Sequence, residues 1–266
     1  MSVHFASLKG LRDSNEDKHT IELGMNEQVT NRANANFFGI YDGHGGKFVS
    51  KFLASNLPKF FIEPQVSYPL TTKYVNDVFG ELQNTLYTKH QDNATECGST
   101  CLAVCQYIVD KKQYINVINV GDSRCVLCRN NLAIPLTKDH KPNWPDEKAR
   151  ISLLGGQIRF DRYDWRINDL SVSRAFGDKA SEKYVTSTPD LYKYKIGRND
   201  KFIIMGCDGL WDVCTSQEAV NFVLDNCYDV NMKRINKNVN IARKLAEHAL
   251  NHDSSDNLTI IIVFFE

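Results

Sequence analysis

The sequence predicts an α+β protein in which sheets pack beneath helices. Three observations support this class. Two stretches in the first third of the chain carry apolar residues at helical spacing, short strand-like runs fill the middle, and helices alternate with strands towards the end. The 266 residues contain no internal repeat and no linker-like tract, so we expect one domain spanning residues 1–266.

The first third of the chain predicts two strands and two helices. They are a strand at Lys18–Leu23, a buried strand that begins at Phe37, and helices at Lys47–Leu57 and Thr71–His90. Pro58 should end the first helix, because proline lacks the N–H that a helix interior needs. The second helix carries one apolar face, made of Val75, Val78, Phe79, Leu82 and Leu86. The connecting residues 7–17 and 25–36 are polar and turn-prone.

The rest of the chain predicts a run of strands and then mixed elements. An antiparallel meander is expected from the runs Gly98–Val109, Tyr114–Val120, Cys125–Arg129 and Leu132–Leu136. A helix at Pro145–Leu154 begins at a proline and stops at two glycines, and the charged, irregular residues 157–168 beyond it indicate a surface flap. The last elements are a strand at Phe202–Cys207, helices near Ser216–Asn226 and Ile235–Asn251, and a strand at Asn257–Phe265.

Composition and charge describe a soluble globular protein. Hydrophobic residues make up 42% of the chain and charged residues 24%. Lysine plus arginine equals aspartate plus glutamate at 32 each, which argues against a strongly basic nucleic-acid-binding protein. The first residues lack the plan of a signal peptide, and no apolar run is long enough to span a membrane. We therefore expect a cytoplasmic protein, with the nucleus as the alternative, and no membrane partner.

The eight cysteines are scattered through apolar runs and are interpreted as reduced core residues. Cys125 and Cys128 form a CxxC, but they lie in a predicted strand, where residues three apart point to opposite faces. We therefore expect neither a zinc site nor a redox site there.

Three aspartates stand at the ends of apolar strands. Asp42 and Asp208 each follow such a strand and precede a glycine, and Asp256 comes just before the final strand. If these strands are neighbours, the carboxylates converge at one edge, where like charges need cations to stay ionised together. Oxygen ligands without a cluster of His and Cys select Mg²⁺ or Mn²⁺ over zinc. A pair of such ions activates water for attack on a phosphoryl group.

Neighbouring residues extend this pattern and leave an alternative open. Glu16 and Asp17 are candidates to join the acids, and Arg12 has the fork geometry that grips phosphate oxygens. Taken alone, the stretch around Asp42 is also compatible with a tight turn in which Asp42 caps backbone N–H groups and His44 is solvated.

Ten short stretches resemble the metal-dependent protein phosphatases, the protein phosphatase 2C family, in the family's order and over nearly the whole chain. The stretches are Arg12–Asp17 (RDSNED), Asp42–Gly46 (DGHGG), Gly98–Thr100 (GST), Asn119–Arg124 (NVGDSR), Leu136–Pro142 (LTKDHKP), Ala149–Gly156 (ARISLLGG), Leu170–Asp178 (LSVSRAFGD), Pro189–Asp190, Asp208–Val213 (DGLWDV) and Ser255–Asn257 (SDN). The resemblance implies a four-layer αββα sandwich of two antiparallel sheets flanked by helices. It also implies one catalytic domain over residues 1–266, with a flap subdomain at roughly residues 155–185.

The resemblance also implies a two-metal centre at one end of the sandwich, holding Mn²⁺ or Mg²⁺. Asp42 resembles the carboxylate that bridges both ions. Asp208 and Asp256 resemble ligands of one ion, and Glu16 with the Gly43 carbonyl resembles the ligands of the other. Asp122 and Asp212 match positions linked to a third, weaker ion.

Three further residues resemble catalytic groups of the family. Arg12 matches the phosphate clamp, Asp17 the acid that orients bound water, and His44 the general acid for the leaving seryl or threonyl oxygen. Within other matched stretches, Ser173, Arg174 and Asp178 are expected to tie the base of the flap to the core, and Asp139 and His140 to serve turn structure.

The activity that the resemblance implies is hydrolysis of phosphoserine and phosphothreonine in phosphoprotein substrates by a monomer. The step would be a single in-line displacement by a hydroxide that bridges the two ions. One alternative is a pseudophosphatase that scaffolds a partner; such relatives typically lose metal acids, whereas this chain retains each matched one. Another is a hydrolase of nucleotides or nucleic acid, which the balanced charge opposes.

Overall fold

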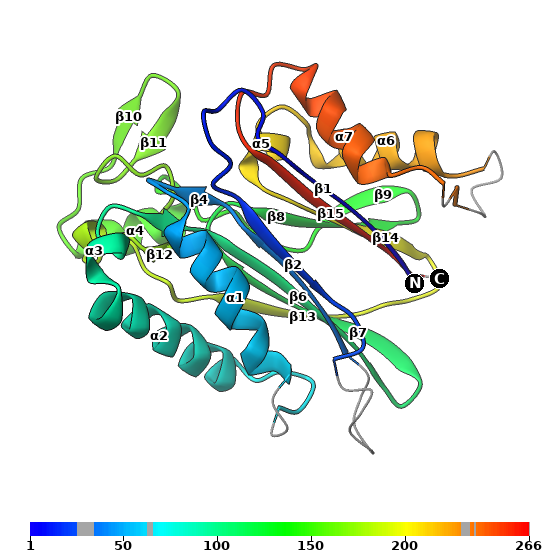
Figure 1. Ribbon diagram of the computed structural model, residues 1–266, viewed down its shortest axis with the longest axis horizontal. Coiled ribbons are helices and arrows are strands. Elements are labelled where there is room, and N and C mark those ends of the chain that lie inside the picture. Colours follow the sequence, from blue (N-terminus) through cyan, green and yellow to red (C-terminus); the bar gives the residue numbers. More distant parts are fainter. Residues whose placement is uncertain (26–34, 63–65, 230–234, 237, 266) are drawn as a thin grey trace.

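Two five-stranded antiparallel sheets dominate the part of the chain that the structure, a computed structural model, describes: residues 1–25, 35–62, 66–229, 235–236 and 238–265 (Figure 1). The first sheet has the order β1 (Ser2–Leu8), β15 (Leu258–Phe264), β14 (Asp200–Gly206), β8 (Arg124–Arg129) and β9 (Leu132–Pro135). The second has the order β13 (Asp190–Lys195), β7 (Lys112–Val120), β6 (Cys101–Val109), β3 (Ala35–Tyr41) and β2 (Lys18–Glu22). The expected α+β class with antiparallel sheets is confirmed.

Side chains alternate between two separate cores along the central strands. In β14, Ile203 and Met205 join residues of both sheets in a core between the sheets. Phe202 and Ile204 point the other way, into a core shared with α6 (Ser216–Cys227) and α7 (Ile241–Leu250). A third core lies between the second sheet and two helices, α1 (Phe48–Ile62) and α2 (Thr72–Lys89). This alternation follows from the two-residue repeat of a strand buried on both faces.

The expected meander of four strands is wrong. β6 and β7 form one hairpin in the second sheet, β8 and β9 form another in the first, and β7 is not paired with β8. The two hairpins close through pairs of residues with positive φ, Asp110-Lys111 and Asn130-Asn131, the geometry of tight hairpin turns. At the intervening Gly121-Asp122-Ser123 only the glycine has positive φ, and the chain crosses from one sheet to the other.

The prediction that Pro58 ends the first helix is also wrong, because α1 continues to Ile62. A proline inside a helix leaves the carbonyl four residues earlier without its usual donor. Here that carbonyl, on Ala54, accepts a hydrogen bond from the Thr20 hydroxyl of β2 at 3.3 Å. A side chain from the neighbouring strand thus replaces the missing N–H.

Other predictions hold, and several strands were missed. The strands β2 and β3, the helix α2 with its five buried apolar residues, and the helix α4 (Pro145–Leu153) are confirmed. β1 and β13 were not predicted. The last helix begins at Ile241, later than expected, where the Asn240 side chain accepts a hydrogen bond from Arg243 N–H. Residues 26–34 of the expected polar loop lie outside the described residues.

All eight cysteines are buried and unpaired. Cys125 packs in the core between the sheets, whereas Cys128 packs in the core beneath α6 and α7. The interpretation of this CxxC as two residues on opposite faces is therefore confirmed. Within the described ranges, no helix has both the length and the apolar character needed to cross a bilayer.

Short elements complete the end of the sandwich that carries the predicted acids. They are α3 (Gln91–Ala94), a three-stranded sheet of β12 (Phe176–Gly177), β5 (Gly98–Ser99) and β4 (Gly43–His44), a hairpin of β10 (Arg159–Asp161) and β11 (Asp164–Arg166), a 3₁₀ turn at Lys179–Ser181, and α5 (Asp208–Trp211). The residues expected to be an irregular flap therefore form a hairpin, which stands beside α4 (Figure 1).

A buried ion-pair network joins α4 to the chain leading into β13. The Glu147 side chain is only 3% exposed and accepts hydrogen bonds from Arg174 at 2.6 Å and Arg150 at 2.9 Å. Arg174 also pairs with Asp190 at 3.0 Å, and His140 contacts the same aspartate at 3.1 Å. Arg174 thus ties the base of the flap to the core, as expected.

We predict that Glu147→Gln destabilises the protein by about 2–3 kcal/mol at pH 7, because it removes the buried carboxylate that accepts charged hydrogen bonds from two half-buried guanidinium groups. Burial raises the pKa of Glu147, but the Arg174 and Arg150 hydrogen bonds outweigh burial and lower it from 4.5 to about 2. A lowered pKa stabilises the fold above pH 4.5, and this contribution is lost as pH falls through 2.

The measurement is urea unfolding of wild type and variant between pH 7 and pH 3. The difference in unfolding free energy should shrink as pH falls. A difference independent of pH would contradict the assignment, and Glu182→Gln, at an exposed glutamate, is the control.

Candidate metal centre and catalytic cleft

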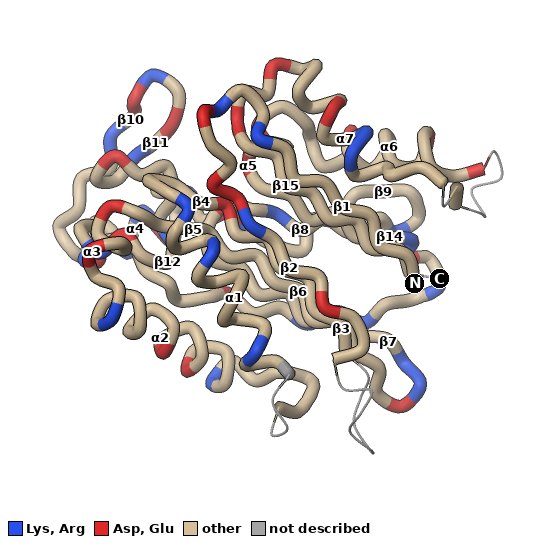
Figure 2. Tube along the Cα trace, viewed as in Figure 1, with Lys and Arg blue, Asp and Glu red and all other residues tan. Residues whose placement is uncertain are grey.

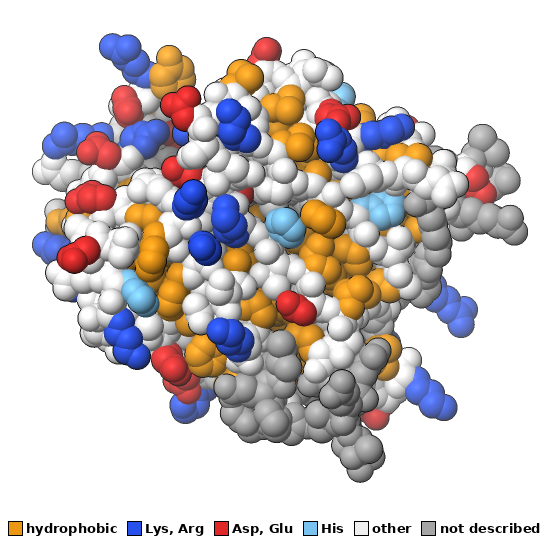
Figure 3. Space-filling view, in the orientation of Figure 1, with side chains coloured by type: hydrophobic (Ala, Val, Ile, Leu, Met, Phe, Trp, Pro, Cys, Tyr) orange, Lys and Arg blue, Asp and Glu red, His pale blue; other side chains and the backbone are white. Residues whose placement is uncertain are grey.

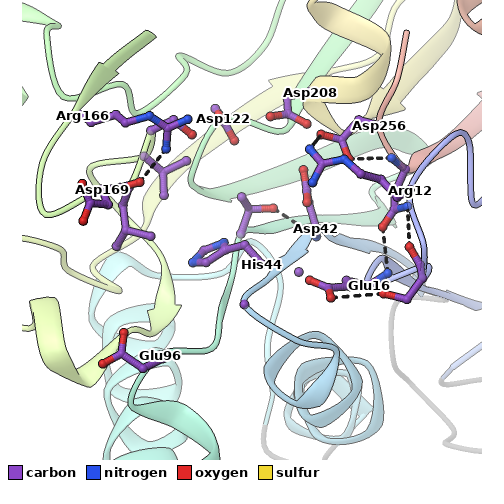
Figure 4. A pocket seen from close by; sticks show the side chains of 18 of the residues that line it. Arg12, Glu16, Asp42, His44, Glu96, Asp122, Arg166, Asp169, Asp208 and Asp256 are labelled. Atoms are coloured by element: carbon purple, nitrogen blue, oxygen red, sulfur yellow. Dashed lines mark hydrogen bonds and ion pairs between the residues drawn. The ribbon is translucent and has the colours of Figure 1, made fainter. Parts of the chain in front are cut away.

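A cleft of about 550 Å³ opens at one end of the two sheets, and most predicted site residues line it (Figure 4). Strand pairing brings them there: Gly206, at the end of β14, lies opposite Ile260 of β15 and Arg124 of β8, and Tyr41 of β3 lies opposite Lys18 of β2. The predicted residues that line the cleft are Arg12, Glu16, Asp42, Gly43, His44, Asp122, Asp208 and Asp256. Figure 2 shows acidic residues gathered near the start of β2.

The strand-end aspartates form a cluster of like charges. Asp42, Asp122 and Asp208 each offer a carboxylate oxygen, and these oxygens lie within 4.8 Å of one another. Burial raises the pKa of Asp42 well above its ordinary value, and the charges of Asp208, Asp17 and Asp122 raise it further. The pKa of Asp208 is raised in the same way by burial, Asp122 and Asp212. Carboxylates held this close together in a buried site favour binding of cations that would neutralise them.

Asp17 lies beneath this cluster and has no ordinary partner. Its carboxyl group is 2% exposed, and neither carboxylate oxygen has a hydrogen-bond partner within the described residues. Burial raises its pKa to about 6, although the nearby Thr259 and Cys207 side chains oppose the shift. This buried carboxylate lacks hydrogen-bond donors and lies beside three others. A hydrated divalent cation would supply the missing interactions. The donors that line the cleft are oxygens, which suits Mg²⁺ or Mn²⁺.

Glu16 is held against the cleft by Asn257. The Asn257 side chain accepts a hydrogen bond from Glu16 N–H at 2.8 Å and donates to the carbonyls of Lys9 at 2.7 Å and Ser14 at 2.9 Å. Gly43 must be glycine here, because a Cβ would lie 2.6 Å from the Glu16 carbonyl oxygen. Asn257 belongs to a matched stretch, but its contact with Glu16 depends on tertiary structure and was not predicted.

Arg12 reaches the cluster from the loop before β2. Its Nη2 atom donates to Asp256 Oδ2 at 2.6 Å, and its side chain is 59% exposed. The predicted phosphate clamp is therefore paired with a predicted metal ligand. A cation at Asp256 would compete for that carboxylate and leave the guanidinium available to an anion.

His44 contacts Asp178, a partner that the sequence did not predict. His44 Nε2 lies 2.8 Å and 3.0 Å from the two carboxylate oxygens of this buried residue. Burial lowers the pKa of His44, but the hydrogen bond and charge of Asp178 outweigh burial and raise it. The expectation that Asp178 ties the flap base to the core gives way to a contact with the candidate general acid.

The two residues predicted for a third ion are placed differently. Asp122 is buried in the cluster, and its Oδ2 lies 2.6 Å from Lys141 Nζ. Asp212 is exposed and does not line the cleft. Lys141 also reaches Asp164 of β11 at 3.3 Å. The sequence analysis missed this lysine, although it lies in a matched stretch.

We predict opposite effects of Asp42→Asn on stability with and without metal. In EDTA the variant should melt about 2–4 °C above wild type, which corresponds to roughly 1 kcal/mol in a protein of this size, because one repelling carboxylate is gone. Mn²⁺ should raise the melting temperature of wild type and leave the variant unchanged.

Differential scanning fluorimetry measures both effects. Asp225→Asn, at an exposed aspartate of α6, is the control and should follow wild type. Equal stabilisation of wild type and Asp42→Asn by Mn²⁺ would remove Asp42 from the metal centre.

Comparison with known proteins finds a matching family model and similar sequences. The family model for protein phosphatase 2C matches residues 1–258. A PP2C-like domain-containing protein of Acanthamoeba polyphaga mimivirus is 50% identical over 172 residues, which cover 58% of this chain and 96% of that protein. A probable protein phosphatase 2C of Oryza sativa subsp. japonica is 33% identical over 273 residues, covering 99% of this chain and 87% of the relative.

A solved structure shares the fold. The crystal structure of serine-threonine phosphatase 2C from Toxoplasma gondii matches with a TM-score of 0.81 and 25% identity, over 99% of this chain and 94% of that chain. The family model, the relatives and the fold agree, and this chain belongs to the protein phosphatase 2C family of protein phosphatases.

Proposed function

We propose that this protein is a serine/threonine protein phosphatase that works with two divalent cations, Mn²⁺ or Mg²⁺, on phosphoprotein substrates. The observation that carries the proposal is the set of mutually repelling carboxylates of Asp42, Asp122 and Asp208 in one cleft, with the orphan carboxylate of Asp17 beneath them. Arg12 and His44 line the same cleft. The residues proposed as cation ligands, phosphate clamp and proton donor thus lie around one cleft.

The ligands divide between two cation positions. Asp42 would contribute to both, Glu16 and the Gly43 carbonyl to one, and Asp208 and Asp256 to the other. When bound, the cations would supply positive charge opposite the phosphoryl group and lower the pKa of a water molecule in the cleft. Asp122 and Asp212 would hold a third, weaker ion, and Asp122 would then exchange its contact with Lys141 for that ion.

The chain's own residues bind the substrate and move its protons. Arg12 presents two N–H groups to the phosphoryl oxygens, which fixes the phosphate for in-line attack. The Asp17 carboxylate accepts a hydrogen bond from the attacking water and orients it. His44 donates its proton to the leaving seryl or threonyl oxygen, and Asp178 keeps the imidazole oriented and favours its protonated form.

The proposed function is tested by phosphate release from a phosphothreonine peptide with Mn²⁺, with Mg²⁺ and with EDTA. Wild type should release phosphate with either ion and none with EDTA. Asp208→Asn should lose about 10²- to 10³-fold of the rate, the loss typical when an electrostatic group at a reacting centre is removed. Circular dichroism checks that the variant is folded. A folded wild type that releases nothing with either ion would point instead to a scaffold.

The role of His44 predicts a dependence on the leaving group. His44→Gln should slow hydrolysis of a phosphothreonine peptide by about 10²-fold or more, because an alkoxide leaves poorly without a proton. Hydrolysis of p-nitrophenyl phosphate should fall much less, because nitrophenolate leaves without one. Equal losses on both substrates would show that His44 acts on binding or structure and not as the acid. Asp178→Asn should show the same selectivity in weaker form.

A further inference from the structure

Three lysines lie together beside the catalytic cleft, and we name them the lysine cluster: Lys18, Lys47 and Lys51. Lys18 begins β2, Lys47 immediately precedes α1, and Lys51 follows in the first turn of that helix. Figure 3 shows blue side chains gathered over the start of α1 and β2. Lys47 and Lys51 both line one hollow, and β2, which begins with Lys18, packs against α1. The three lysines therefore lie on the same side of the cleft.

Nothing in the described part of the chain pairs with the two exposed members of the cluster. Lys47 and Lys51 form no ion pair there, and the first turn of α1 contains no acidic residue. Positive charge at a helix N-terminus is unfavourable, because the backbone N–H groups already make that end positive. Lys18 donates to the carbonyls of Asp17 at 2.6 Å and Asn15 at 3.3 Å, so its position is fixed. The cluster therefore concentrates positive charge that an external anion would stabilise.

The lysine cluster adjoins the path of a bound substrate. Lys47 and Lys51 line a hollow of about 490 Å³ that shares Gly45 and Glu96 with the catalytic cleft. A polypeptide whose phosphorylated residue occupies the cleft can therefore continue into this hollow. Asp92 and Glu96 also line it, and neither is paired with a lysine in the described residues. The hollow is thus lined by two lysines from the start of α1 and by two acidic residues from α3 and the chain that follows it.

We propose that the lysine cluster is a docking subsite for anionic side chains of the phosphoprotein substrate, on one side of the residue being dephosphorylated. This inference rests on the proposed phosphatase function. It deepens that function by naming a substrate class: phosphoproteins with carboxylates, or a second phosphate, beside the target residue. Charge complementarity carries the choice, since Lys47 and Lys51, which form no ion pair within the described residues, are exposed in the hollow next to the cleft, with Lys18 nearby.

The test compares phosphothreonine peptides that share one core sequence. Three residues on the amino side, or three on the carboxyl side, are Glu, Ala or Lys, and a further peptide carries a second phosphoserine there. With Mn²⁺-loaded wild type, acidic residues on one side should lower KM about 3- to 10-fold relative to alanine, with kcat unchanged, as expected for two or three exposed ion pairs. The advantage should shrink at high salt. The phosphoserine arm shows whether phosphate serves as well as carboxylate.

Two variants locate the effect. A Lys47→Ala, Lys51→Ala double variant should lose the preference for acidic peptides and keep its activity on p-nitrophenyl phosphate. Lys59→Ala is the matched control, because Lys59 is an exposed lysine in the last turn of the same helix. It should behave as wild type.

The outcomes separate this proposal from the phosphatase assignment. A preference for acidic peptides that survives in the double variant, or a preference for the lysine peptides, would overturn the lysine cluster as a subsite while activity on p-nitrophenyl phosphate upholds the enzyme. If wild type hydrolyses neither substrate, the proposed function fails. Fluorescence anisotropy of labelled Glu and Ala peptides on the Mn²⁺-loaded protein then decides the subsite without turnover, because equal affinities would exclude it.

Discussion

The carboxylates of the cleft repel one another, and the fold must hold them together against that repulsion. Asp42, Asp122 and Asp208 come from three separate places in the chain, yet their oxygens lie within 4.8 Å of one another. No local segment would adopt this arrangement, because each acid would be better hydrated apart. The two sheets impose it. Their apolar cores fix the strands, and the strand ends then carry the acids to one place.

The flap and the cleft are anchored by ionic contacts of different kinds. At the flap base, Arg174 is fully engaged between Glu147 and Asp190, with His140 beside them, so these charges are satisfied. In the cleft, the Asp17 carboxylate has no hydrogen-bond partner among the described residues, and the Arg12–Asp256 ion pair is exposed to solvent. A satisfied network stabilises a structure, whereas an unsatisfied one is a binding site. This contrast is the physical reason for placing the chemistry in the cleft.

Much of the fold could be predicted because its signals are local. The apolar face of α2, the buried strand before Asp42 and the glycines after α4 follow from spacing and backbone chemistry. The strand β1 was missed because short, half-buried edge strands carry little periodicity. The passage of the chain from one sheet to the other at Gly121–Ser123 was missed. The alternation of side chains in β7 and β8 is compatible with either sheet. The prediction that the helix ends at Pro58 was wrong because the Thr20 hydroxyl of β2 replaces the N–H that proline lacks. That contact joins segments distant in the sequence.

The candidate site likewise contains features that could be predicted from the sequence and features that could not. Acids at strand ends are visible in sequence, and so are the residues of matched stretches. Contacts between distant segments are not: the partnership of His44 with Asp178, the bond from Lys141 to Asp122 and the support of Glu16 by Asn257 depend on tertiary structure. The lysine cluster is another such case, since Lys18 begins β2, whereas Lys47 follows β3 and β4.

The hydrogen bond between Glu16 and Asn257 joins residues 241 positions apart, and it has a consequence for biosynthesis. A ribosome makes Glu16 and Asp42 long before Asp256, and β15 pairs with both β1 and β14 in the first sheet. Until β15 emerges, β1 has no partner strand and Asp256 is missing from the cleft. A nascent chain therefore cannot assemble the complete set of acids. Chain topology thus delays assembly of the centre until the last strand has been made.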